Sequence, residues 1–367
     1  MKAKRFFAVA AAAALCCGVT IAAPADKGWK SVLRETSEEF FTTDSAKAVG
    51  ERVLAYQRVT GGWAKNINIV KYHTPAEIEA VIAEKGRVDD STTDNGSTTM
   101  QILYLARLYN ATREAKYLEA CRRGVDYLLA GQYENGGWPQ FWPNPEGYQI
   151  HITYNDDAMA CTMMLLKDVG LSRAPFADPQ LFDEATRARA AEAFDKGVAC
   201  ILRTQIVVDG EPTVWCQQHY RDTYEPAPAR TYELPSYCSQ ESVTIVKMLM
   251  EIENPSPEVI AAVDGAMKWF DRTKLAGLRI ERTINPDGSR NTRLVEDPDA
   301  TPLWARFYDL DSCTPYVCDR DGIPRRNLDE IGSERRNGYS WYNDHALELY
   351  PIYATWSAKL GNHNNNK

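Results

Sequence analysis

Between two helical patterns the chain reads Glu134-Asn135-Gly136-Gly137-Trp138-Pro139, and an earlier break reads Gly61-Gly62-Trp63-Ala64-Lys65-Asn66. Each loop follows a segment with apolar residues at helical spacing, and its glycines permit the backbone angles that end a helix. Each tryptophan either covers the core or lines a groove, and the sequence leaves both open. Repeated helix, Gly-Gly-Trp loop and helix predict a mainly α fold, an α/α toroid-like incomplete (α/α) barrel with long loops. An irregular helical array is the alternative.

Hydrophobic periodicity places the other elements. We expect helices over 45–59, 98–109, 114–130, 158–169, 181–203, 240–253, 258–273 and 341–360. The inner helices of the barrel would start at Asp94, Asp156, Gln240 and Asp344. Two strands at 277–283 and 289–295 flank an Asp-Gly turn, so they predict a small β-hairpin.

The first 25 residues have the pattern of a secretory signal peptide. Lys2, Lys4 and Arg5 precede an apolar run, and Ala23-Pro24-Ala25 is a small-residue cleavage site. Removing the three cations changes the formal charge from -8 to -11. An acidic surface argues against nucleic acid as a partner, and no later stretch is long and apolar enough for a membrane helix. We expect a periplasmic or secreted monomer with one domain over 26–360 and a disordered polar tail over 361–367.

Nine cysteines are present, and two of them lie in the expected signal peptide, which leaves seven. Cys313 and Cys318 are close in a loop and are the best candidates for a disulfide. No Cys/His spacing resembles a zinc site.

Acidic side chains recur where helices are expected to begin. Asp94, Asp156 and Asp157 stand beside Asn95 and Asn155, and carboxylate and amide oxygens are the ligands that calcium prefers. Taken singly, each aspartate is better explained as a helix cap. Asp94 with Asp156 or Asp157 could also be the carboxylate pair of a glycoside hydrolase.

Cationic side chains lie in aromatic or proline-rich loops. Arg230 follows Glu225-Pro226-Ala227-Pro228-Ala229, Arg306 lies in Trp304-Ala305-Arg306-Phe307-Tyr308, and Lys65 follows a Gly-Gly-Trp loop. Arginines held in stiff loops are suited to bidentate capture of carboxylates. The alternative is local ion pairing, which is strongest for Arg320 between two aspartates. No histidine has an evident serine or cysteine partner for a triad.

An ordered set of motifs resembles the family 10 pectate lyases. The set spans residue 48 to the final helix and comprises Gly61-Gly62-Trp63-Ala64-Lys65-Asn66, Thr93-Asp94-Asn95-Gly96-Ser97-Thr98-Thr99, Asn135-Gly136-Gly137-Trp138-Pro139-Gln140, Tyr154-Asn155-Asp156-Asp157-Ala158-Met159, Trp215-Cys216-Gln217-Gln218-His219 and Ala229-Arg230-Thr231-Tyr232-Glu233. The resemblance implies a toroid-like helical fold and calcium-assisted cleavage of polygalacturonate by anti β-elimination, giving 4,5-unsaturated oligogalacturonates. One departure is mild, because many relatives have proline where Ala64 stands.

The resemblance also implies roles for single residues. Asp94 and Asp156 match active-centre aspartates that bind Ca2+ and the substrate carboxylate, and Arg230 matches the arginine regarded as the base at C5. Arg306 and Arg320 match arginines that grip uronate carboxylates. We expect Asp94 and Arg230 to be catalytic. The expected metal ligands are Asp94, Asn95, Asp156 and Asp157, and the expected substrate-binding residues are Lys65, Arg306, Arg320, Tyr154 and Trp341. The motif does not decide between Asp156 and Asp157.

Three other functions remain compatible with the sequence. A carboxylate-pair glycoside hydrolase would give saturated products, whereas elimination leaves a conjugated double bond that absorbs ultraviolet light. A non-catalytic uronate-binding protein would bind without releasing product. A lyase acting on another uronate, such as alginate, is the third. Endo or exo action, tolerance of methyl esters and the number of subsites stay open.

Overall fold

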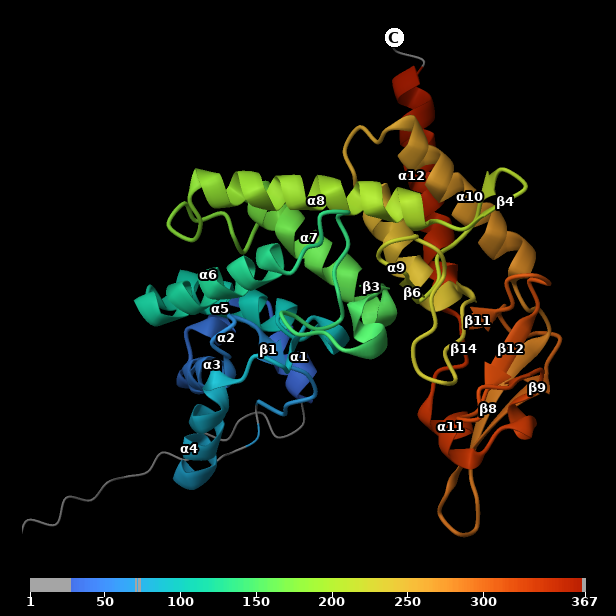
Figure 1. Ribbon diagram of the computed structural model, residues 1–367, viewed down its shortest axis with the longest axis horizontal. Helices are drawn as coiled ribbons and strands as arrows, with labels where there is room; N and C mark the ends of the chain where they lie inside the picture. The colour runs from blue at the N-terminus through green and yellow to red at the C-terminus, as the bar shows by residue number, and fades with distance from the viewer. Residues whose placement is uncertain (1–27, 70, 72–73, 365–367) are drawn as a thin grey trace, which may run out of the picture.

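The computed structural model describes residues 28–69, 71 and 74–364 (Figure 1). Its α-helices are α1 (Trp29–Leu33), α2 (Glu38–Phe41), α3 (Asp44–Tyr56), α4 (Pro75–Ala83), α5 (Thr99–Thr112), α6 (Ala115–Ala130), α7 (Ala158–Gly170), α8 (Glu184–Thr204), α9 (Ser239–Met250), α10 (Pro257–Thr273), α11 (Ser333–Gly338) and α12 (Leu349–Asn364). The 3₁₀ turns are η1 (Glu84–Gly86), η2 (Asp94–Gly96), η3 (Gly147–Ile150), η4 (Asn155–Asp157), η5 (Leu328–Glu330) and η6 (His345–Glu348).

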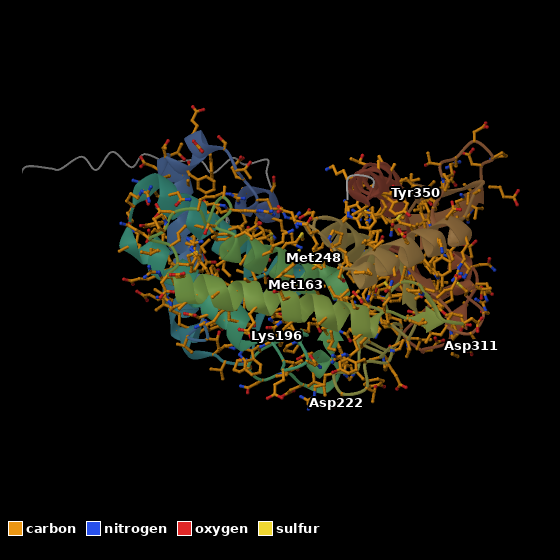
Figure 2. The ribbon with its side chains drawn as sticks, turned by 90° about the horizontal axis from the view of Figure 1, so that it is seen from above. Met163, Lys196, Asp222, Met248, Asp311 and Tyr350 are labelled. Atoms are coloured by element: carbon orange, nitrogen blue, oxygen red, sulfur yellow. The ribbon has the colours of Figure 1, made fainter. Side chains whose placement is uncertain are left out.

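The helices form a row of antiparallel hairpins. Within the hairpins α5 packs on α6, α7 on α8 and α9 on α10. Between hairpins α5, α7, α9 and α12 contact one another in succession, and α6, α8 and α10 do the same on the outer side. Seen from above, α8 runs along the row while the first helices and α12 stand at opposite ends (Figure 2). One continuous hydrophobic core runs through the row.

Short antiparallel strands join these hairpins on one side. The two-stranded sheets pair β1 (Trp63–Ala64) with β2 (Ser91–Thr92), β3 (Ile152–Thr153) with β6 (Gln218–His219), β4 (Val207–Val208) with β5 (Glu211–Pro212), β10 (Trp304–Ala305) with β14 (Tyr342–Asn343), and β8 (Leu278–Ile284) with β9 (Arg290–Glu296). A four-stranded sheet has the order β13 (Pro324–Arg325), β12 (Pro315–Cys318), β11 (Phe307–Tyr308), β7 (Tyr237–Cys238).

The predicted fold class is wrong. A mainly α toroid with one hairpin was expected, but the described chain combines its helical row with six small sheets. In Figure 1 the blue and the red ends of the row lie apart, and the strands β8, β9, β11 and β12 form a β layer beside the red end. The physical reason is length, because a strand of two residues shows no alternating hydrophobic pattern that a sequence could reveal.

Most helix predictions are confirmed within a few residues, and so is the hairpin, which is β8–β9. The last helix begins at Leu349, and residues 341–348, expected to be helical, form β14 and η6 instead. Helix α12 continues past the expected end of the domain to Asn364. The expected signal peptide, 1–25, lies outside the described residues. The described part holds no helix long and apolar enough to cross a membrane.

The two Gly-Gly-Trp loops have the same structure. The indole N–H of Trp63 donates to the carbonyl of Val53 at 2.8 Å, and that of Trp138 donates to Leu128 at 2.7 Å. Each tryptophan therefore satisfies a free carbonyl near the end of the preceding helix. Both rings are fully buried, so the open choice between core and groove is settled in favour of the core.

The first glycine of each loop is required by close backbone contact. Gly61 and Gly136 both have φ of +92°, a conformation that favours glycine. A Cβ at Gly61 would lie 2.2 Å from the carbonyl oxygen of Arg123, and one at Gly136 would lie 2.1 Å from that of Lys196. Each loop thus lies against the backbone of the next outer helix, which fixes the strand and the turn that follow.

The predicted disulfide between Cys313 and Cys318 is wrong. Both thiols are free, as are the other five cysteines of the described residues. Cys318 lies in strand β12 and is buried, whereas Cys313 is half-buried in the loop before that strand.

Candidate active site

Two 3₁₀ turns bring a pair of aspartates together. Turn η2 follows β2 and carries Asp94, turn η4 follows β3 and carries Asp156, and the two turns are in contact. Asp156 and Asp157 have φ of +50° and +59°, a conformation that costs about 1–3 kcal/mol per residue and persists where surrounding structure imposes it. The amide of Asn155 lies between the two carboxylates, 3.5 Å from Asp94 Oδ1 and 3.3 Å from Asp156 Oδ2. The structure therefore brings these two acids, which the sequence marks as site candidates, close together.

The Asp94 carboxylate is buried and fully engaged. It accepts hydrogen bonds from Lys65, from Gln140 Nε2 at 3.0 Å and from Asn155 Nδ2 at 3.5 Å. The ammonium of Lys65 also lies 5.4 Å from the centre of the Phe141 ring. Lys65 thus lies beside Asp94.

A second buried carboxylate, Glu241, lies beneath Asp156. Arg306 pairs with Glu241, and its Nη2 lies 3.8 Å from Asp156 Oδ1 and 3.4 Å from Asn155 Oδ1. Arg306 is only 4% exposed, so it acts mainly by neutralising these acids.

The two neighbouring aspartates differ in their surroundings. Burial, followed by the negative charges of Glu241 and Asp94, raises the pKa of Asp156. Burial and then the charge of Glu241 raise the pKa of Asp157 to about 6, although Thr244 of α9 lowers it. Since the charge of Asp94 acts on Asp156, and Asp157 is influenced by α9 instead, Asp156 is the natural partner of Asp94.

The acid cluster, defined as Asp94, Asp156, Asp157 and Glu241, has an excess of negative charge. Its four carboxylates face two close cations, Lys65 and Arg306, which leaves two charges unbalanced. The oxygen donors suit a hard cation, and the buried Gln140 Oε1 beside Asp94 has no hydrogen-bond partner in the described residues. These side chains are not preassembled for a metal, since no group of three or more His, Cys, Asp or Glu in the described part has that geometry. Asn95, also expected to be a ligand, is half-buried in η2 and contacts none of them through a recorded hydrogen bond.

Next to the acids, and sharing Arg306 with them, four arginines surround two tyrosine rings. Arg230 lies 4.9 Å from the centre of the Tyr232 ring and 5.7 Å from that of Tyr339, and Arg306 lies 4.6 Å from Tyr339. Two further arginines stack on Tyr232. Their distances to the centre of its ring are 5.8 Å for Arg320 and 4.6 Å for Arg335. We call these six residues the arginine wall. Stacking leaves the edges of the guanidinium groups to carboxylates, and here these edges bind Glu233, Glu241 and Glu334.

Arg230 is fixed by Glu233. The Glu233 carboxylate is 3% exposed and accepts hydrogen bonds from Arg230 Nε at 2.7 Å and from the Tyr339 hydroxyl, also at 2.7 Å. Burial lowers the pKa of Arg230, but the pairing with Glu233 outweighs burial and raises this pKa above the usual arginine value. Gln217 donates to both Glu233 and Asn155, so it links the arginine wall to the acid cluster.

Two predicted substrate-binding residues lie in the core instead. Tyr154 is 1% exposed, and its hydroxyl is 2.6 Å from Thr204 Oγ1. Trp341 is 2% exposed and donates to the carbonyl of Arg335. Neither ring offers a face to a polymer, and both support the site from beneath. Arg320 is exposed, stacks on Tyr232 and pairs with Glu334 rather than with the flanking Asp319 and Asp321, so the expected local ion pairing is wrong.

Sequence reasoning missed five residues that hold the site together, namely Gln140, Gln217, Glu233, Glu241 and Tyr339. The first three stand inside the quoted motifs, which was the available signal. Glu241 pairs with an arginine 65 residues away in the sequence, and Tyr339 bonds a glutamate 106 residues away, so no local pattern indicates them.

His219 in strand β6 supports the turn that carries Asp156. Its buried, neutral ring leads us to expect that the stability of the fold depends on pH. Its Nδ1 is 2.8 Å from the Tyr224 carbonyl and its Nε2 accepts from the Cys216 N–H, an arrangement of the neutral ring. Burial lowers the pKa of His219 to about 4, although the bond to Tyr224 raises it.

Between about pH 6.5 and 4 the unfolded chain therefore binds a proton that the folded chain does not, and stability falls as the pH falls. We expect this histidine to lower the free energy of unfolding by about 2 kcal/mol between pH 7 and 5, measured by urea denaturation. His219→Gln should lose that part of the pH dependence, and equal slopes for both proteins would contradict the assignment.

Comparison with solved structures defines the class of protein as a polysaccharide lyase. The chain is 30% identical to an Asp-to-Ala mutant of a family 10 polysaccharide lyase from Cellvibrio cellulosa in complex with trigalacturonic acid, covering 88% of this chain and 99% of that one, with a TM-score of 0.74. It is 32% identical to the family 10 polysaccharide lyase from Cellvibrio cellulosa, covering 87% and 95%, with a TM-score of 0.76.

The particular family follows from the sequence. The model of the pectic acid lyase family matches residues 57–349, and the chain belongs to this family. It is thus an enzyme, a polysaccharide lyase, which excludes the non-catalytic binding protein. No curated protein matches the chain.

Proposed function

We propose that this enzyme cleaves polygalacturonate by calcium-assisted anti β-elimination, with Arg230 taking the C5 proton. The observation that carries the proposal is that the arginine wall adjoins a cluster of excess acid through Arg306 and Gln217, and that Arg230 in this wall is partly exposed. A polyuronate presents one carboxylate per sugar, which arginines bind and a divalent cation bridges to protein acids. The solved relative in complex with trigalacturonic acid supports the same substrate class.

Asp94 and Asp156, with the acid cluster around them, would hold the calcium ion together with a uronate carboxylate. When bound, calcium would supply positive charge near the uronate carboxylate, where negative charge grows during elimination. Side chains of the protein balance the remaining charges: Lys65 neutralises Asp94 and Arg306 neutralises Glu241. The exposed Arg320 binds the carboxylate of a neighbouring sugar of the substrate. The guanidinium of Arg230 stacks on Tyr232, and its side chain is 44% exposed, so it is open to a bound substrate.

In the elimination, Arg230 accepts the proton from C5, the C5–H electrons form the C4–C5 double bond, and the C4–O4 bond breaks. The leaving oxygen takes a proton from solvent, and the new chain end is unsaturated. The Glu233 pairing keeps Arg230 protonated in the free enzyme, so the guanidinium must first release a proton. That requirement favours an alkaline working pH.

Membership of a lyase family argues against hydrolysis by the aspartate pair, which would give saturated products. We also propose that the enzyme acts outside the cytoplasm, on the basis of the expected signal peptide. Alginate is the competing uronate.

Ultraviolet absorbance tests the proposal directly. On polygalacturonate with calcium, the enzyme should release products that absorb through a conjugated double bond, because elimination leaves the C4–C5 bond next to the carboxylate. Absorbance and product mass are to be followed on polygalacturonate and on alginate in parallel. Saturated products, or release from alginate alone, would contradict the proposal.

A further inference from the structure

Glu233 has more hydrogen-bond donors directed at it than a simple ion pair needs. Its two oxygens accept from the Arg230 backbone N–H at 3.1 Å, from Arg230 Nε at 2.7 Å and from Arg230 Nη2. The Tyr339 hydroxyl at 2.7 Å and Gln217 Nε2 at 3.4 Å complete the set. A carboxylate that is 3% exposed and so fully paired holds one rotamer of its partner.

The partners of Glu233 belong to both halves of the site. Tyr339 is also the ring on which Arg306 stacks, and Gln217 also donates to Asn155 beside Asp156. A displacement of Glu233 would therefore move the guanidinium of Arg230 relative to the acid cluster. Arg230 itself is 44% exposed in its side chain, so without Glu233 it would be free to turn toward solvent.

We propose that Glu233 is the positioning residue for the base: it fixes the Arg230 guanidinium against Tyr232 and sets its distance from the acid cluster through Gln217. The inference rests on the proposed function, in which Arg230 meets the C5 proton. Glu233 touches no reacting atom, and it acts through the orientation and the charge of Arg230. Burial raises the pKa of Glu233, but the guanidinium outweighs it and keeps this carboxyl ionised, so its charge is constant over the working range.

Glu233→Gln tests the inference, since glutamine has the same size but replaces one acceptor oxygen by a donor. At most one of the two guanidinium bonds survives this change. We expect kcat on polygalacturonate to fall about 10- to 100-fold with KM nearly unchanged, because a small displacement of a reacting group costs rate rather than ground-state binding. The rise of the rate toward alkaline pH should also begin at lower pH, since Arg230 loses the negative charge that holds its proton.

Two further variants keep the test interpretable. Tyr339→Phe retains the ring under Arg306 but removes one donor to Glu233, and should lower kcat about threefold in the same direction. Glu253→Gln breaks an exposed pair with Arg173 and should leave kcat, KM and the pH profile unchanged. Far-ultraviolet circular dichroism and the thermal midpoint verify that each variant is folded.

The outcomes separate the two proposals. A wild-type enzyme without unsaturated product refutes the proposed function, and this inference with it. If the wild type is active but the Glu233→Gln variant has the same kcat, or differs from the wild type only in KM, the positioning role alone is refuted. A lower kcat without displacement of the pH profile also refutes it, because that result is expected of a merely structural residue.

Discussion

Replacing Arg230 with alanine is expected to lower kcat on polygalacturonate by about 10³-fold, the range that a positioned proton acceptor contributes. Arg230 is the one arginine of the wall that combines partial exposure with a buried carboxylate holding it from behind. The alanine variant removes both the proton acceptor and a cation facing the substrate. Its fold should persist, because Tyr232 and Tyr339 remain packed against Arg335.

Arg230→Lys and Arg320→Ala are the matched controls. Lysine retains the positive charge but lacks the planar guanidinium group with its paired N–H donors, so it should restore substrate binding but little turnover. Arg320→Ala removes an exposed member of the same wall and should raise KM a few-fold while kcat stays near the wild-type value. Rates and KM are to be measured by absorbance at the wild-type optimum. A variant Arg230→Ala that keeps most of its activity would show that another group takes the proton.

The helical part of the fold was predictable because it rests on local chemistry. Helices of 12 to 21 residues, such as α8 and α9, show several turns of hydrophobic periodicity. The short strands carry no such signal, and their pairing depends on distant segments: Ile152 pairs with His219, and Trp304 pairs with Asn343. The architecture was therefore the part that sequence reasoning missed.

The site divides in a similar way. Asp94, Asp156 and Arg230 were found because motifs mark them, and the choice of Asp156 over Asp157 needed the structure. Aromatic residues in loops were misleading, since Tyr154 and Trp341 look like sugar platforms in sequence but lie in the core. Whether a ring is exposed depends on packing by segments far away in the chain, which no local pattern encodes.

Removal of calcium is expected to abolish turnover, and its return should restore it. Without a cation, the four carboxylates of the acid cluster face only Lys65 and Arg306, and a uronate carboxylate would enter an already negative site. Activity should disappear in excess chelator and recover as free calcium is raised. Turnover that persists in excess chelator would remove calcium from the mechanism.

The two adjacent aspartates make this prediction specific. Asp156→Asn removes a charge that acts directly on Asp94, and should raise the calcium concentration that gives the half-maximal rate by about 100-fold. Asp157→Asn removes a charge that faces Thr244 of α9 instead, and should change this concentration only a few-fold. Because the two variants alter the net charge equally, a difference between them reports ligand position rather than charge. Equal shifts would mean that the cluster attracts calcium only through its overall field, and a larger effect of Asp157→Asn would reverse the assignment of the ligand.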